Sequence, residues 1–257
     1  MNTTLRKILE HSPCERGWRT LVSGLGRNLA SNDAALSIAT IRSICGVEDA
    51  IWALKTLDSM NPDDRLVVSS GFVASSRSLH KLPSLHNSGI RERAKIILWM
   101  CDVCELSLPI FEAYKQHDLR PKRLIEKMRD YAEGRRTQPE VEDAYKEVRA
   151  ANREIAKEIT FARSSSLFVD DVKLAQLAKL VVDATINAAC LWPLAAAYCV
   201  VDCLLDRRQV PEDCGKLRDF YVWENGGFVL LKADAVDARH EILWKKIDAL
   251  FCERLLK

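Results

Sequence analysis

The sequence carries almost no excess charge of either sign. Its 38 lysines and arginines are balanced by 36 aspartates and glutamates, which leaves a net charge of +2 over 257 residues. Because both signs are spread along the whole chain, no global field would attract nucleic acid or an anionic membrane. Hydrophobic residues make up 48% and charged residues 29%, proportions that are ordinary for a folded globular protein and argue against disorder.

The sequence also lacks the short motifs that mark common catalytic centres. It contains no G-x-S-x-G, no glycine-rich phosphate loop and no H-E-x-x-H, and its five histidines are scattered. Acidic pairs such as Asp63/Asp64 and Asp170/Asp171 fall at expected helix starts, where capping explains them. We therefore expect a protein that is not an enzyme and that needs no cofactor.

Neither a secretory signal nor a membrane span is expected. The first 18 residues contain no apolar core of the length that a signal needs. The longest uncharged run, Ala184 to Val201, is rich in alanine and includes Asn187 and Pro193, which favours a helix buried against protein. Nine cysteines, several of them in apolar helical stretches, are typical of a reducing compartment. We expect a cytoplasmic protein.

What the sequence does contain is apolar residues at helical spacing. The stretch from Arg91 to Arg135 predicts two helices joined by a polar elbow at residues 117–121. Pro121 suits the first turn of the second helix. A long helix is predicted from Gln138, and a later one is predicted to continue through the uncharged run to near Leu205. The apolar run at 66–74 fits a strand or a helix, and we favour a helix.

A change of pattern near the end predicts the only strands. Phe220 to Trp223 and Phe228 to Leu231 flank an Asn-Gly pair, which tolerates the positive φ angles of a tight turn. The predicted fold class is mainly α: an irregular multi-helix bundle with one small β-hairpin near the C-terminus. We divide it into an N-terminal helical subdomain (1–88), a central helical domain (89–210) and a C-terminal hairpin plus helix (211–257).

Four cysteines allow a metal hypothesis. Cys101 and Cys104 form a C-x-x-C, and Cys199 and Cys203 also lie at helical spacing. Two such pairs facing each other would match the tetrahedral ligand set of zinc. Both pairs lie in apolar helices without glycine-rich knuckles, so we favour core packing, and a metal or redox role stays open as an alternative.

The elbow and the helix after it are locally basic. The basic residues are Arg120, Lys122, Arg123, Lys127, Arg129, Arg135 and Arg136. Such a patch could contact phosphate or an acidic protein surface. Glu126, Asp130 and Glu133 interleave with it, so a solvated face with intrahelical ion pairs is favoured and nucleic-acid binding is the weaker alternative.

Several short motifs in the middle of the chain point to one family. They are Cys104-Glu105, Leu108-Pro109-Ile110-Phe111-Glu112, Asp118, Arg120-Pro121-Lys122, Ile125-Glu126 and Glu133-Gly134. Through them the segment 101–134 resembles the bacterial immunity-protein-five-like family, and the motifs at 12–18 and 47–54 resemble uncharacterised bacterial and phage-borne proteins. The resemblance implies an all-helical protein that binds and neutralises a toxin without catalysis. The 184–205 helix and the hairpin depart from the pattern.

The leading hypothesis is therefore an immunity-like or phage-borne inhibitor that binds a bacterial toxin or defence component. Because arginines and aromatic residues supply much of the binding energy of interfaces, the candidate contacts lie in the elbow and the hairpin. They are Asp118, Arg120, Lys122, Arg123, Tyr221 and Trp223. The alternatives are an enzyme with a metal-dependent site at the four cysteines and a nucleic-acid-binding protein. The oligomeric state stays open.

Overall fold

The N-terminal unit is built from short elements. The structure, a computed structural model, describes residues 1–26, 32–60, 88–164, 169–205, 220–224, 227–231 and 233–256. The unit contains β1 (Asn2–Thr3), α1 (Leu5–Glu10), α2 (Glu15–Leu25), β2 (Leu36–Ser37), α3 (Ile38–Cys45) and α4 (Val47–Ala53), followed by 3-10 turns at Leu54–Thr56 and Asp58–Met60. The apolar run at 66–74 lies outside the described residues.

Longer helices make up the rest of the described chain. They are α5 (Ser88–Glu105), α6 (Leu108–Tyr114), α7 (Arg120–Ala132), α8 (Gln138–Ser164), α9 (Val169–Ala189), α10 (Pro193–Leu205) and α11 (Ala233–Leu255), with β3 (Phe220–Glu224) and β4 (Gly227–Leu231) before the last helix. The prediction of a mainly α protein is confirmed. None of the described helices combines the length and the apolarity needed to cross a lipid bilayer.

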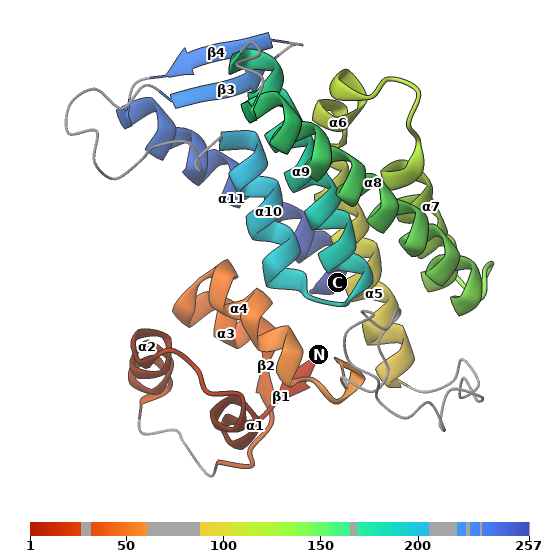
Figure 1. The fold of residues 1–257 in the computed structure, drawn as a ribbon. Helices are drawn as coiled ribbons and strands as arrows, with labels where there is room; N and C mark the ends of the chain where they lie inside the picture. The colour runs from red at the N-terminus through yellow and green to blue at the C-terminus, as the bar shows by residue number, and fades with distance from the viewer. Residues whose placement is uncertain are drawn as a thin grey trace.

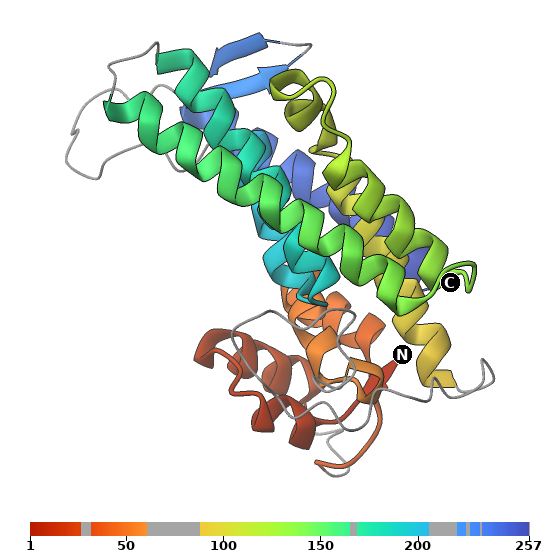
Figure 2. The same ribbon diagram turned by 45° about the vertical axis from the view of Figure 1, so that its right-hand side comes forward.

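The helices form a bundle with the N-terminal unit at one end. Figures 1 and 2 show α1 to α4 below the bundle, while β3 and β4 lie at the opposite end. In the bundle, α9 packs against α8 and α10, and α5 packs against α7, α10 and α11. Trp99 of α5 and Phe251 of α11 are fully buried and meet edge to face, with ring centroids 5.8 Å apart. The core therefore runs continuously between these helices.

The predicted long helix from Gln138 is confirmed as α8. Its apolar positions recur every three or four residues, so that one face is buried over the whole length. The buried residues of that face are Val141, Ala144, Tyr145, Val148, Ala151, Ile155 and Ile159. Helical spacing alone was sufficient here because no proline or glycine interrupts the pattern after the first turn.

Two helices are shorter than predicted. The stretch from Arg91 was expected to give one helix before the elbow, but α5 ends at Glu105 and α6 begins at Leu108. Pro109 lies in the first turn of α6, where its missing N–H breaks no hydrogen bond, whereas in a continuous helix it would remove one and clash with the preceding turn. The backbone N–H and the hydroxyl of Ser107 both donate to the carbonyl of Cys104, at 3.1 and 3.0 Å, and so satisfy an acceptor at the end of α5.

The helix predicted to end near Leu205 is also divided. The chain leaves α9 at Ala189 and begins α10 at Pro193. Leu191 in the connection has a φ of +56°, a left-handed conformation that no helix interior allows. Pro193 disfavours helical geometry in the residue before it, which explains why the uncharged run is two helices.

Two strand pairs are present in the described residues, where one was predicted. β3 and β4 pair antiparallel, with Phe220 opposite Leu231. β1 and β2 also pair antiparallel, and this second sheet lies at the N-terminus. The prediction was wrong in expecting strands near the C-terminus alone, because strands of two residues are too short to show alternation. The sheet is anchored by Thr3, whose hydroxyl lies 2.7 Å from that of Thr56.

One charged network ties three helices together. Asp102 of α5 lies 3.0 Å from Arg129 of α7 and 2.6 Å from Arg254 of α11, and its side chain is only 10% exposed. A carboxylate this buried is stable only when it is paired, and here two guanidinium groups compensate it. The network ties both α7 and α11 to α5.

Candidate protein-binding surface

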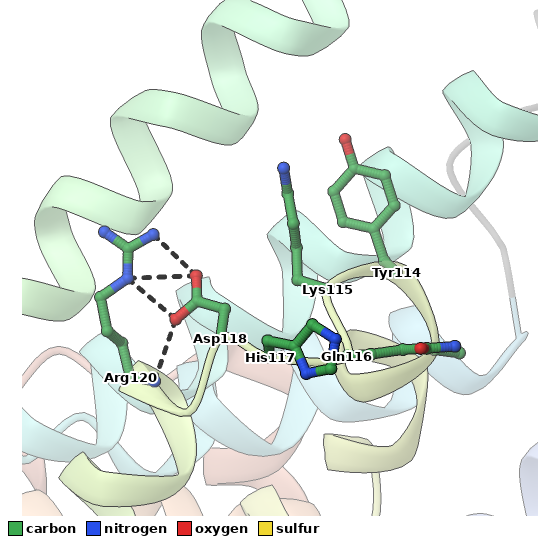
Figure 3. Close-up of a pocket in the computed structure, with 7 residues that line it drawn as sticks. Tyr114, Lys115, Gln116, His117, Asp118 and Arg120 are labelled. Carbon is green, nitrogen blue, oxygen red and sulfur yellow. Dashed lines mark hydrogen bonds and ion pairs between the residues drawn. The ribbon is translucent and has the colours of Figure 1, made fainter.

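The elbow connects α6 to α7 and frames a shallow hollow. The chain turns at residues 115–119, where the N–H of Asp118 donates to the carbonyl of Lys115 at 3.0 Å. The hollow has a volume of about 690 Å³ and is lined by Ala113, Tyr114, Lys115, Gln116, His117, Asp118 and Arg120. Figure 3 shows Asp118 and Arg120 facing each other while Tyr114 and Lys115 extend side by side from the end of α6.

Arg120 fixes the conformation of the elbow through hydrogen bonds. Its Nη2 lies 2.7 Å from Asp118 Oδ2 and 2.5 Å from Glu154 Oε2, and the backbone N–H of Arg120 donates to Asp118 Oδ1 at 3.1 Å. The side chains of Arg120 and Asp118 are 25% and 16% exposed. One guanidinium group therefore joins the turn itself to α8, because its planar fork can serve two carboxylates at once.

A second acidic residue of α8 holds the other side of the elbow. Glu158 accepts from the hydroxyl of Tyr114 at 2.5 Å and from the ammonium group of Lys115 at 2.7 Å. Glu154 and Glu158 are four residues apart, so both project from the same face of α8. Their role could not be predicted from the sequence, because the spacing of Glu154 and Glu158 shows a shared face but not which cations that face meets.

The ion pairs shift the pKa values of the groups that make them. Burial alone would raise the pKa of Asp118, but the hydrogen bonds from Arg120 outweigh it and the pKa lies below the ordinary 3.8. The hydrogen bond from Arg120 likewise lowers the pKa of Glu154. Both carboxylates are therefore ionised at neutral pH, and the elbow is held by charge-assisted hydrogen bonds.

Other residues of the elbow face solvent. Gln116, His117, Leu119, Lys122 and Arg123 are all exposed, and we call this set the elbow face. Leu119 leaves 41% of its surface in water. Neither Lys122 nor Arg123 makes an ion pair within the described residues, so the elbow face combines two available cations with an exposed apolar side chain.

Most of the remaining basic residues of this region are paired. Arg129 lies 2.8 Å from Glu105, Arg135 lies 2.6 Å from Asp130, and Arg136 lies 2.7 Å from Glu140. The charges are compensated as predicted, but none of these three pairs lies within a single helix, so the prediction of intrahelical pairs was wrong for them. Such pairing weakens the field that phosphate groups would meet and gives no specific support to nucleic-acid binding.

The four candidate cysteines are packed in the core. Cys101, Cys104, Cys199 and Cys203 are all buried. The thiol of Cys101 donates to the carbonyl of Ile125 at 3.6 Å, and that of Cys203 donates to the carbonyl of Leu177 at 3.4 Å. Burial raises the pKa of Cys101 and Cys104 well above the ordinary 9.0. In the described part of the chain, no three His, Cys, Asp or Glu residues are grouped to hold a metal ion, so the zinc hypothesis gains no geometric support.

The two aromatic candidates belong to a different element from the elbow, later in the chain. Tyr221 and Trp223 belong to β3, where they pair with Leu230 and Phe228 of β4. The structure describes only the backbone of this strand, so the positions of these two side chains stay a prediction. Of the other candidates, Asp118 and Arg120 come together in one network, and Lys122 and Arg123 are exposed beside it.

The elbow lies in a segment that matches a protein-family model. No curated protein and no solved structure matches the chain. A family model matches residues 87–166, a segment that contains α5, α6, α7 and α8. The elbow and both of the α8 glutamates that hold it lie within the match. The resemblance predicted from the motifs at 101–134 is thereby confirmed: this segment is similar to the family described as Imm-5 like putative immunity protein.

Proposed function

We propose that this protein is a non-catalytic inhibitor that neutralises a bacterial toxin or defence protein by binding it. The observation that carries the proposal is the family match over residues 87–166, because the segment it covers forms the elbow and its support. An immunity protein acts by covering the working surface of its partner, so its function resides in an exposed surface rather than in a pocket with reactive groups.

The elbow face is suited to such a contact. Arg120, Tyr114 and Lys115 are already fixed to α8, so binding would not have to order the turn and would lose little conformational entropy. Lys122 and Arg123 supply two exposed cations, and Leu119 supplies an apolar contact. Charge complementarity therefore favours a partner that presents an acidic surface.

In this proposal the four elbow candidates have different roles. Lys122 and Arg123 contact the partner directly, whereas Asp118 and Arg120 hold the shape of the turn because each is already engaged within the chain. Tyr221 and Trp223 remain candidates for a second contact. Two contact regions would allow discrimination between related partners, since specificity is a difference between affinities.

The test is growth rescue against a bacterial toxin, chosen from among the proteins encoded near this gene in its native genome. The partner would be expressed in bacteria with wild-type protein, with the elbow variant K122E/R123E, or with the control variant K245E/K246E. The control reverses the same two charges on α11, where Lys245 and Lys246 are exposed. We expect rescue by the wild type and the control, and loss of rescue by the elbow variant.

Purified proteins would then separate binding from folding. If the elbow variant keeps its helical circular dichroism and melting temperature but binds the partner at least about tenfold more weakly, the elbow face is the contact. Equal rescue by all three proteins would remove the elbow from the proposal. Absence of rescue by the wild type, with both proteins soluble and present, would count against neutralisation of that toxin.

A further inference from the structure

A deeper cleft lies away from the elbow, between the N-terminal unit and α10. It has a volume of about 540 Å³, which is within the usual range for small-molecule sites. Residues from α2, α3, α4 and α10 line it, among them Trp18, Cys45, Asp49, Trp52, Leu194 and Tyr198. We call it the α4–α10 cleft. It lies outside the segment that matches the immunity family.

The two carboxylates of the cleft differ in how they are satisfied. Glu48 accepts a hydrogen bond from the hydroxyl of Tyr198 at 2.5 Å. Asp49 is partly buried, yet within the described residues it accepts no hydrogen bond and forms no ion pair. Its oxygen atoms are not among the buried side-chain atoms that lack a partner, so water in the cleft still reaches them. The cleft therefore contains one carboxylate that is open to a ligand, with Arg16 as the nearby opposite charge.

Gly17 of α2 packs closely against Asp49, which only a residue without a side chain allows. A Cβ added to Gly17 would lie 3.0 Å from Asp49 Oδ1 and 3.2 Å from the sulfur of Cys14. Any larger residue at this position would therefore press against the carboxylate. Since Gly17 lies within α2, where glycine disfavours the helix, its absence of a side chain is best explained by the close approach of Asp49 and Cys14.

We propose that the α4–α10 cleft binds a small organic cation, an ammonium or amidinium group carried on an apolar body. Asp49 pairs with the cationic group, and Trp18 provides the aromatic surface that such ligands favour. The ring of Trp52, which also lines the cleft, already has the ammonium group of Lys55 4.1 Å from its centroid. Arg16 is the one basic residue among the described lining residues, against Glu48 and Asp49, so the lining carries a net negative charge. This site is independent of the proposed function.

The ionisation of Asp49 is consistent with this assignment. Burial raises its pKa, the neighbouring charge of Glu48 raises it further, and Arg16 lowers it. Burial and Glu48 thus both make the carboxylate less stable as an anion. A bound cation would reverse both effects, because it supplies the opposite charge at close range. Ligand binding would therefore offset part of the cost of keeping the Asp49 carboxylate ionised in a partly buried position.

The experiment compares three ligands of the same shape and different charge. Benzamidine, benzamide and benzoate would each be titrated into the full-length protein by isothermal calorimetry. We expect saturable binding of benzamidine, with a dissociation constant at least about tenfold lower than that of benzamide, and no binding of benzoate. Equal affinity for benzamidine and benzamide, or tighter binding of benzoate, would overturn the proposal.

Variants separate the site from non-specific attraction. D49N is expected to abolish the preference for benzamidine over benzamide and to fold normally, because Asp49 accepts no hydrogen bond from the described residues. D143N removes an exposed carboxylate on α8 and serves as the matched control, with benzamidine binding unchanged. A second variant, G17A, keeps every charge but narrows the cleft and is expected to weaken both ligands. Unaltered benzamidine binding in D49N and G17A would place the ligand elsewhere and refute the assignment.

Discussion

Replacing Arg120 by alanine tests whether the elbow is held by its ion pairs. The substitution removes every side-chain hydrogen bond from α7 to Asp118 and both of those to Glu154. Asp118, whose side chain is only 16% exposed, would retain the backbone N–H of residue 120 as its donor. Alanine suits the first turn of a helix, so the change should disturb the network and not the helix.

The magnitude follows from the exposure of the two pairs. The Arg120–Glu154 pair is largely solvated, with Glu154 54% exposed, and contributes about 0.5–1 kcal/mol. The Arg120–Asp118 pair is better shielded and multiply hydrogen bonded, which corresponds to about 1–1.5 kcal/mol after allowance for partial solvation. We therefore expect R120A to lower the free energy of unfolding by about 2 kcal/mol. In a chain of this size that is a decrease in Tm of about 4–8 °C.

The difference in unfolding free energy between the wild type and R120A should depend on pH. The pKa values of Asp118 and Glu154 are lowered in the folded protein from ordinary values of 3.8 and 4.5. A lowered pKa stabilises the folded state above the unfolded-state pKa, and the effect is lost as the pH falls through the folded-state value. The wild type and R120A should therefore differ fully at pH 7 and converge as the pH falls below about 4.

Thermal and urea unfolding followed by circular dichroism would measure both effects. K122A is the matched control, because Lys122 is exposed and makes no ion pair within the described residues; its stability should change by less than about 0.5 kcal/mol. If R120A unfolds at the wild-type temperature, or if the difference persists unchanged at pH 3, the elbow is not held by these charges. The division of roles between Arg120 and Lys122 would then fail.

Three further outcomes are expected. D102A should lower the free energy of unfolding by about 3 kcal/mol in urea titrations, because it leaves two arginines of α7 and α11 without their shared carboxylate; a loss below 1 kcal/mol would contradict this. F251A should cost about 3–5 kcal/mol and change the fluorescence of Trp99, against which its ring packs. Iodoacetamide followed by mass spectrometry should label exposed Cys14 quickly and Cys101 only after unfolding, because Cys101 is buried and its pKa is raised; fast labelling of Cys101 would refute the packing.

Helical spacing predicted the long elements because burial of one face is a local property. In α8 the apolar residues recur without interruption, so the face that the pattern selected is the face that the structure buries. Breaks were harder to place. Pro109 and Pro193 can each lie in the first turn of a new helix or at a kink in a continuous one, and the choice depends on whether neighbouring helices can accept the turn. In both places the chain begins a new helix.

The elbow itself was visible in the sequence, but its supports were not. Pro121 and the polar residues before it marked a turn, and the family motifs marked the same segment. The partner of Arg120 is 34 positions away in Glu154, and which residue of α8 meets it depends on how that helix is rotated against α7. A one-residue change in that rotation would present a different side chain, since successive residues of a helix point about 100° apart.

The α4–α10 cleft shows why a site can be absent from every local pattern. It exists only because the N-terminal unit docks against the bundle, where Arg42 of α3 donates to both carboxylate oxygens of Asp248 in α11 at 2.5 Å across 206 positions. The hydrogen bond from Tyr198 to Glu48 spans 150 positions. Docking of this kind supplies a hydrogen-bond donor to Glu48, whereas Asp49, its neighbour in α4, has none among the residues that the structure describes. Two adjacent acidic residues in a first helical turn look equivalent in the sequence, because both suit the helix dipole. Only the packing of α10 distinguishes them, so a ligand site at Asp49 follows from the tertiary contacts and not from the residue pair.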